Sequence, residues 1–228
     1  YTLGIIGGMG PMATAAFMEK IIKNTKADTD QEHMPMIVYH LPQVPDRTAY
    51  ILGKSDESPV PFIIDAAQKL EKAGVTEIAI PCVTAHRFRK EIQSAVSAPL
   101  LDGVEDTAKY LSHRHVKKAG IMATAGTVKA DLFGNAFKTC GMECVYPDVD
   151  RQTLVMEFIY DCIKSGKPVD EKKLGEVTTY LSECGADVIV LGCTELSLIP
   201  KELFSCEIVD VLDVLAQTCI DHRNHNRG

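Results

Sequence analysis

The sequence predicts an α/β protein built from two similar halves, each with a mainly parallel sheet flanked by helices, and a cleft between the halves. Short apolar runs typical of strands alternate with segments of helical periodicity, which is the pattern of parallel α/β folds. The same order of segments then starts again halfway along the chain. Each half also ends an apolar run with a cysteine that a threonine follows closely, at Cys82 and at Cys193.

The first half shows the alternation most clearly. Its apolar runs predict strands at residues 3–6, 36–41, 77–81 and 99–101. Between them, apolar residues recur at helical spacing, which predicts helices at residues 13–22, 63–73, 85–96 and 104–111. Glycines follow the first strand, and Gly74 follows the second helix, as expected for the turns that separate such elements.

Three segments of the second half repeat segments of the first. The equivalent pairs are Gly4 and Gly120, 116 residues apart, Cys82 and Cys193, 111 apart, and Asp102 and Asp210, 108 apart. We therefore expect one domain at residues 1–112 and a second at 117–208, with residues 209–228 packing back on the first. Ligands of open parallel sheets bind beyond the carboxyl ends of the strands. Cys82 and Cys193 are thus expected to meet across one cleft.

Composition narrows the class of protein. The chain has 228 residues, 24 Lys and Arg against 31 Asp and Glu, and a net charge of −7, which argues against nucleic-acid binding because that affinity depends on basic side chains. No apolar run approaches the roughly 18–20 residues of a membrane span. We expect a soluble cytoplasmic protein whose eight scattered cysteines are reduced thiols.

Two thiols on opposite sides of a bound molecule suit proton transfer. A thiol has a free pKa of roughly 8.5, which a nearby cation or helix N-terminus lowers toward neutrality. One thiolate can then remove a proton from one face of a carbon while the opposite thiol delivers a proton to the other face. The product of such a reaction is the mirror image of the substrate, so racemisation next to a carboxylate is the natural candidate.

Other uses of these cysteines remain open at this point. Cys82 and Cys193 could form a disulfide, although a reducing compartment disfavours it. A zinc site would need three or four ligands, and only His86 and Glu195 accompany the two cysteines. Cys82 could also act as a single nucleophile with His86 as its base, which leaves the second copy without a role.

Four motifs resemble the cofactor-independent aspartate/glutamate racemases over essentially the whole chain. They are residues 4–11 (GIIGGMGP), residues 42–48 (PQVPDRT), the segment Pro81-Cys82-x-Thr84-Ala85-His86, and Gly192-Cys193-Thr194-Glu195. The resemblance implies catalysis without pyridoxal phosphate (PLP) or metal, on a small dicarboxylic amino acid, in a homodimer. It also implies that Cys82 and Cys193 exchange acid and base roles with the handedness of the substrate.

A dianionic substrate in a net-negative protein needs local cations, and arginine suits bidentate contacts with carboxylates. The resemblance implies that Arg47 binds the side-chain carboxylate and that Lys164 is a further carboxylate anchor. Lys167 lies close enough to Lys164 to be the alternative anchor, and Gln43 is expected to support the same subsite. For Arg47, a structural ion pair with Asp46 is the simpler alternative, and for Lys164 it is a charge at a helix C-terminus.

The glycine-rich segment from Gly8 to Ala13 fits the pattern G-x-G-x-x-A after a strand, which is typical of dinucleotide sites. Such a site also needs an acidic residue after the second strand, and this chain has His40 there. We expect the loop to direct backbone N–H groups at a carboxylate; a simple tight turn is the alternative. The resemblance favours Met9 lying against the substrate.

Several polar residues complete the expected site. The backbone of Val83 to Ala85 and the hydroxyls of Thr84 and Thr194 are expected near the substrate, while His86 and Glu195 could support the thiols. Thr124 and Thr127 mirror the glycine loop in the second half, although turn capping explains them equally well. The racemases usually carry Asn where this chain has Val83, which suggests broader or altered specificity.

Two other functions stay open. One is a related isomerase or decarboxylase of small carboxylates, or a racemase of other amino acids, on the same scaffold. The other is a catalytically silent amino-acid-binding protein, in which Val83 marks lost chemistry.

Overall fold

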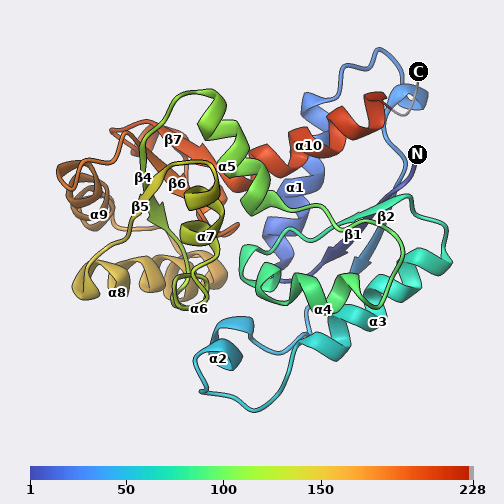
Figure 1. Ribbon diagram of the computed structural model, residues 1–228, viewed down its shortest axis with the longest axis horizontal. Helices are drawn as coiled ribbons and strands as arrows, with labels where there is room; N and C mark the ends of the chain where they lie inside the picture. Colours follow the sequence, from blue (N-terminus) through green and yellow to red (C-terminus); the bar gives the residue numbers. More distant parts are fainter. Residues whose placement is uncertain (226–228) are drawn as a thin grey trace.

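The computed structural model describes residues 1–225 and shows two α/β units side by side (Figure 1). The first sheet has the order β2-β1-β3, formed by β1 (Leu3–Gly7), β2 (Met36–His40) and β3 (Glu77–Ala79). The second has the order β5-β4-β6-β7, formed by β4 (Lys118–Met122), β5 (Glu143–Val145), β6 (Val188–Leu191) and β7 (Ile208–Asp210). All paired strands are parallel, which confirms the predicted fold class.

Helices connect the strands of each unit. In the first they are α1 (Pro11–Asn24), α2 (Arg47–Ile51), α3 (Val60–Lys72), α4 (Arg89–Gln93) and α5 (Gly103–His113). In the second they are α6 (Ala125–Lys129), α7 (Leu132–Thr139), α8 (Val149–Glu157), α9 (Glu171–Glu183) and α10 (Val211–His225). Short helical turns lie at η1 (Asp30–Glu32), η2 (Val83–Phe88), η3 (Phe158–Cys162), η4 (Ile163–Ser165), η5 (Leu196–Leu198) and η6 (Lys201–Leu203).

Two predicted elements differ from the structure. The helix expected at 85–96 is a 3₁₀ turn, Val83–Phe88, followed by the short α4. The strand expected at 99–101 makes a single bridge, between Leu100 and Ile78. The tight 3₁₀ turn keeps residues 83–85 buried at the end of β3, where a regular helix would have carried the chain away from the sheet.

The two units exchange a helix. Val104, Ala108 and Leu111 of α5 join the core of the second sheet, whereas Leu212, Leu215 and Cys219 of α10 join Leu3 and Phe17 in the core of the first. Figure 1 shows α10 running across to α1. This exchange fits the predicted repeat, because Asp102 and Asp210 precede the two helices, and each carboxylate accepts a hydrogen bond from the first turn that follows it.

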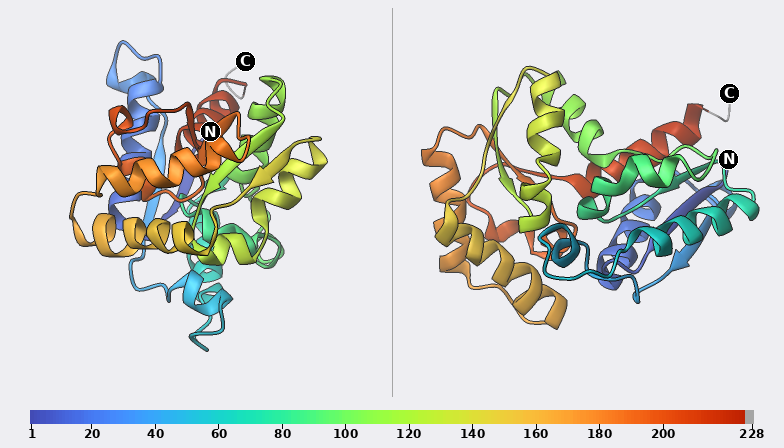
Figure 2. Two further views of the ribbon diagram at one scale, coloured as in Figure 1. Left: turned by 90° about the vertical axis from the view of Figure 1, so that its left-hand side faces the viewer. Right: turned by 60° about the horizontal axis from the view of Figure 1, so that its bottom comes forward.

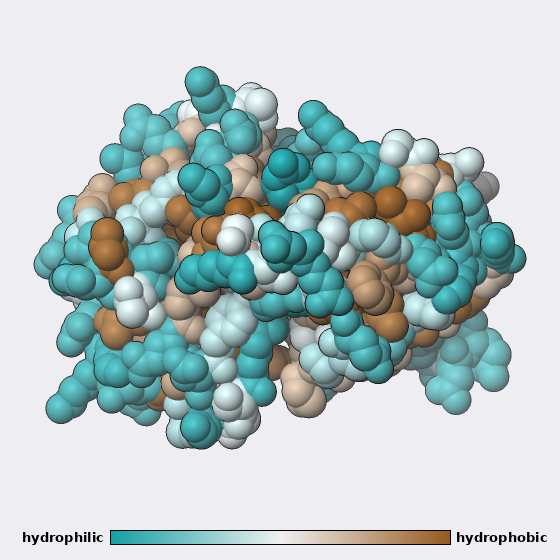
Figure 3. Space-filling model, turned by 90° about the horizontal axis from the view of Figure 1, so that it is seen from below, coloured by the Kyte–Doolittle hydropathy of each residue, from teal (hydrophilic) through white to brown (hydrophobic). Residues whose placement is uncertain are grey.

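Residues of α2, Arg47 and Thr48, line the cavity between the units. In the right-hand view of Figure 2, α2 lies between the two units. The face seen from below is mostly hydrophilic, with apolar residues in patches between polar ones (Figure 3). No helix of residues 1–225 has the length and hydrophobicity needed to cross a membrane.

Candidate active site

The two predicted thiols come together in the cleft. Cys82 follows β3 and precedes the 3₁₀ turn that begins at Val83, while Cys193 follows β6. Both are buried to a similar extent, with 6% and 5% of their surfaces exposed. They line one small cavity between the two units. Because equivalent strands of a repeated fold carry them, the cavity receives one thiol from each unit.

The rest of the cavity wall is divided between the two units. The lining residues, apart from the cysteines, are Met9, Arg47, Thr48, Val83 and Thr84 from the first, and Thr124, Tyr160, Lys164, Thr194 and Glu195 from the second. Most were predicted from the sequence. Any molecule bound here therefore contacts both units at once.

Arg47 begins α2, whose N-terminus is capped by Asp46: the carboxylate accepts a hydrogen bond from the Ala49 N–H at 2.7 Å. The buried guanidinium donates to the carbonyls of Val44 and Pro45, at 3.1 and 3.2 Å, and lines the same cavity as Cys82. Burial lowers the Arg47 pKa, but Cys82 and Asp46 more than offset this and leave it raised. Arg47 therefore supplies a fixed positive charge beside Cys82.

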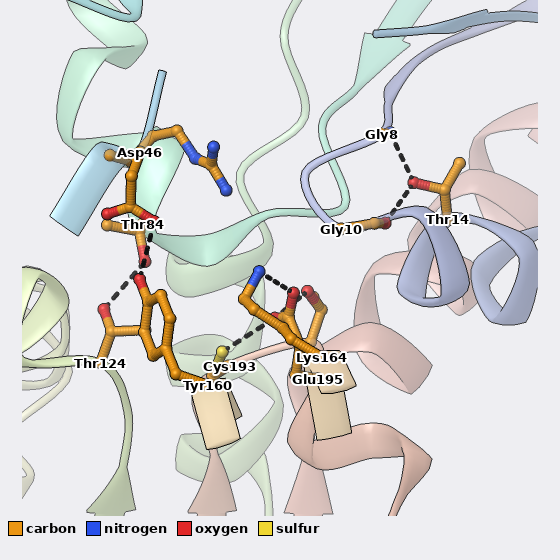
Figure 4. Close-up of polar contacts among 12 residues, drawn as sticks. Gly8, Gly10, Thr14, Asp46, Thr84, Thr124, Tyr160, Lys164, Cys193 and Glu195 are labelled. Carbon is orange, nitrogen blue, oxygen red and sulfur yellow. Dashed lines mark hydrogen bonds and ion pairs between the residues drawn. The ribbon is translucent and has the colours of Figure 1, made fainter. Parts of the chain in front are cut away.

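Lys164, Glu195 and Cys193 form a chain of polar contacts (Figure 4). The Lys164 ammonium lies 2.7 Å from one oxygen of Glu195, and the Cys193 thiol donates to the other oxygen at 3.1 Å. Burial raises the pKa of Cys193 well above its ordinary value, and Glu195 raises it further. Desolvation lowers the Lys164 pKa, but the pairing with Glu195 outweighs it, so Lys164 stays charged.

The glycine loop contributes differently from the prediction. The Gly8 N–H donates to the Thr14 hydroxyl at 2.9 Å (Figure 4) and is therefore not directed at a ligand. Met9 is the loop side chain that lines the cavity. A Cβ on Gly10 would lie 2.8 Å from Oε1 of Glu195. Glycine is therefore needed at position 10 for the loop to pack against the Lys164–Glu195 pair.

Three threonine hydroxyls join the two units. Oγ1 of Thr84 lies 2.9 Å from that of Thr124 and 3.1 Å from that of Thr127, which itself lies 3.1 Å from Thr124. Thr84 and Thr124 line the cavity, whereas Thr127 stands behind them. Thr124 also caps α6, because its hydroxyl accepts from the Thr127 N–H. Thr124 therefore both caps α6 and lines the cavity.

Other predicted residues lie outside the cavity wall. Gln43 is exposed on its loop, and Ala85 is buried behind the lining. His86 directs Nδ1 to the backbone carbonyl of Cys82 at 3.0 Å rather than to the thiol. Lys167 is exposed away from the site, so of the two candidate lysines it is Lys164 that reaches the cavity.

Tyr160 and Thr48 line the cavity but were missed in the sequence. The Tyr160 hydroxyl donates to Oδ2 of Asp46 at 2.9 Å, across the cleft (Figure 4). Burial, together with Asp46, raises the Tyr160 pKa, so the phenol stays neutral. A signal existed, because Tyr160 precedes Lys164 by four residues and such residues share one face of a helix.

The site has the features of proton-transfer chemistry. Within residues 1–225 no group of three or more His, Cys, Asp or Glu side chains is arranged to hold a metal, and every cysteine there is a free thiol. Two buried thiols, two cations and several hydroxyls surround one small cavity, which suits a small carboxylate held between an acid and a base.

Comparison with known proteins agrees with this geometry. The family described as Asp/Glu/Hydantoin racemase matches residues 6–219. The chain is 32% identical over 227 residues to the broad specificity amino-acid racemase RacX of Bacillus subtilis, with 96% of each sequence covered. Picrophilus torridus aspartate racemase superposes with a TM-score of 0.84 at 30% identity, covering 98% of this chain and 94% of the other. Glutamate racemase from Francisella tularensis shares the fold, with a TM-score of 0.73 at 15% identity, covering 99% of this chain and 82% of the other.

Proposed function

The chain belongs to the Asp/Glu/hydantoin racemase family and is an isomerase, and on that premise we propose that it interconverts L- and D-aspartate, glutamate or both. In this proposal Cys82 and Cys193 transfer the proton at the α-carbon by a two-base mechanism that uses neither PLP nor a metal. The substrate binds in the cleft between the proposed domains, residues 1–112 and 117–208.

The observation that carries this proposal is the placement of the two thiols. They are contributed by equivalent strands of the two units, are buried alike, and line one cavity. A planar carbanion between them would be open to protonation from either side. The thiolate that removes the proton and the thiol that replaces it then come from opposite units, as inversion at a carbon requires.

The cations of the cavity suit a carboxylate substrate. We propose that Arg47 and Lys164 bind the side-chain carboxylate and that the hydroxyls of Thr84, Thr124 and Thr194 surround the α-carboxylate. An α-proton is weakly acidic, so a racemase without PLP must stabilise the developing charge with preorganised donors and cations. Met9 would pack against the apolar part of the substrate.

The test is α-deuteration during racemisation. Purified protein is incubated in D₂O without added PLP with each enantiomer of aspartate and of glutamate, and optical rotation and deuterium content are followed. We expect the inverted product to carry solvent deuterium at the α-carbon. Binding of the amino acids without deuterium exchange would instead support a silent binding protein and would overturn the proposal.

Val83 favours a second candidate, a racemase of other amino acids. It presents an apolar side chain to the cavity, where the resemblance to the aspartate/glutamate racemases suggests an amide, and the relative RacX is named for broad specificity. The same deuterium assay with neutral and basic amino acids distinguishes the two candidates. Higher kcat/KM for these than for aspartate and glutamate would support the second.

We further propose that the enzyme works as a homodimer in the cytoplasm, as the family resemblance suggests. Analytical ultracentrifugation measures the oligomeric state directly. A monomer at working concentration would contradict the dimer.

A further inference from the structure

The two thiols face opposite charges although their burial is alike. Cys193 donates a hydrogen bond to the Glu195 carboxylate at 3.1 Å. Cys82 instead interacts electrostatically with the Arg47 guanidinium, which lines the same cavity. With 6% and 5% of their surfaces exposed, the two residues are buried to a similar extent. The charged groups that neighbour the two thiols are opposite in sign.

The contact between Cys193 and Glu195 needs a proton on sulfur. A thiol can donate to a carboxylate, whereas a thiolate at that distance would repel it. The second oxygen of Glu195 is 2.7 Å from the Lys164 ammonium, so these two side chains form an ion pair. A charged Glu195 and a protonated Cys193 are therefore mutually consistent.

Other charged groups around the site do not reverse this difference. Lys164 interacts electrostatically with both thiols, and more strongly with Cys193 than with Cys82. Tyr160 also faces Cys193, but burial raises its pKa and keeps it neutral. Burial raises the Cys193 pKa, Glu195 adds to the rise, and Lys164 opposes it only in part. Arg47 and Glu195 thus distinguish the two sulfurs.

We infer that the resting site holds its proton on Cys193 and its negative charge on Cys82, and that Glu195 is the positioning residue that places the proton there. This inference deepens the proposed racemase function and rests on it for the use made of the thiols. In the first turnover the Cys82 thiolate takes the α-proton, and the electron pair of that C–H bond stays on carbon. The Cys193 thiol then gives its proton to the opposite face.

After that turnover the proton is on Cys82, and a Cys193 thiolate faces Glu195. This form of the enzyme is the less stable one, and it returns to the resting form by proton exchange with water or by turnover of the opposite enantiomer. Because enantiomers are equally stable, kcat/KM must be equal in the two directions whatever the resting form. The inference therefore needs a measurement on the free enzyme.

The experiment measures iodoacetamide alkylation of the full-length protein against pH, with mass spectrometry reporting Cys82 and Cys193 separately. The rate of alkylation is proportional to the fraction of each cysteine that is a thiolate. The pH midpoint at each cysteine therefore reports where that thiol loses its proton, while the accessibility of the sulfur to iodoacetamide changes only the maximal rate. We expect the Cys193 midpoint to lie at least about one pH unit above that of Cys82, equivalent to about tenfold in thiolate at a given pH. Equal midpoints, or a lower one at Cys193, would overturn the inference.

Two variants identify Glu195 as the cause. Glu195→Gln keeps the side-chain shape, removes the negative charge and frees Lys164, so the Cys193 midpoint should fall by about one pH unit. Glu157→Gln is the matched control, because Glu157 pairs with Lys173 at the same 2.7 Å but outside the cavity. An unchanged Cys193 midpoint in Glu195→Gln would contradict the assigned role.

The wild-type measurement keeps the inference testable if Glu195→Gln does not fold. Ultraviolet thiolate absorbance of Cys82→Ser and Cys193→Ser, each compared with wild type, gives the same midpoints without a reagent entering the cavity. Neither measurement needs turnover. Unequal midpoints without racemisation would uphold the proton placement and refute the proposed function. Equal midpoints with racemisation would refute the proton placement and uphold the proposed function.

Discussion

The Cys82 side and the Cys193 side of the cleft have similar backbone arrangements but differ in the charged side chains beside the thiol. Both cysteines follow a parallel strand and lie next to a short helical turn. Arg47, which accompanies Cys82, comes from α2, and Lys164, which pairs with Glu195 beside Cys193, comes from η4. These segments were not among the repeats seen in the sequence. The comparison teaches that a repeated fold can place two like groups symmetrically while added segments give them unlike chemistry.

Removing either thiol should have the largest effect. Cys82→Ala and Cys193→Ala each delete one of the two proton carriers, so we expect kcat for racemisation to fall about 10²–10⁴-fold or more. Chiral chromatography of the amino-acid product measures the loss. Cys219→Ala is the control, because Cys219 is buried in the core between α10 and the first sheet, away from the cavity. Full activity in Cys193→Ala would contradict the proposed two-base mechanism.

Changes to either cation should weaken substrate binding, and a change to Lys164 should also alter the ionisation of Cys193. Arg47→Lys keeps the charge but loses the planar guanidinium, so we expect KM for aspartate to rise about tenfold, equivalent to about 1.4 kcal/mol. Lys164→Met removes an ammonium that Glu195 already pairs. We expect a rise in KM there too, together with a higher pH for Cys193 ionisation, because Lys164 lowers the Cys193 pKa. Steady-state kinetics on both variants gives the comparison.

The pH profile of turnover should also report the difference. The raised pKa of Cys193, caused by burial and Glu195, keeps this thiol protonated to higher pH and extends activity on the alkaline side. In Glu195→Gln the pKa falls, so the alkaline limb of kcat/KM should move to lower pH by about one unit. A shift to higher pH would show that Glu195 stabilises the thiolate instead.

The smallest effect is expected at the hydroxyl cluster that joins the two sides. Thr84→Val removes a buried hydroxyl that bonds across the cleft to Thr124 and Thr127, which should lower the free energy of unfolding by about 1 kcal/mol. Thr107→Val is the matched control, since the Thr107 hydroxyl is equally buried but bonds to the Gly103 carbonyl within α5. Urea denaturation measures both.

The sequence predicted the two parallel sheets and the pair of thiols because both follow from local pattern. Strand and helix periodicities repeat along the chain, and the cysteines stand at equivalent places in the repeat. The choice between Lys164 and Lys167 as the lysine of the cavity, by contrast, needed the structure. The two residues are close in sequence, and only the turn of η4 determines which of them reaches the cavity.

Tyr160 was missed for a different reason. Its spacing from Lys164 was the local signal, but its hydrogen-bond partner, Asp46, lies 114 residues away in sequence, and nothing in either local segment shows that these two side chains meet. Gln43 is the opposite case, because it belongs to the motif at residues 42–48 and was expected at the site but is exposed on its loop. Contacts across a cleft depend on how two units pack, and single-sequence periodicity does not contain that information.

The exchanged helices have a consequence for how the chain is made. Leu3 and Ile5 of β1 and Phe17 of α1 are covered by residues of α10, which follows β7 in the chain. During translation these apolar side chains leave the ribosome about two hundred residues before the helix that covers them. At synthesis rates of about 5–20 residues per second, α10 is synthesised on the order of ten seconds or more after the residues that it covers. We expect the nascent chain to depend on chaperones during that interval, since exposed apolar surface favours aggregation.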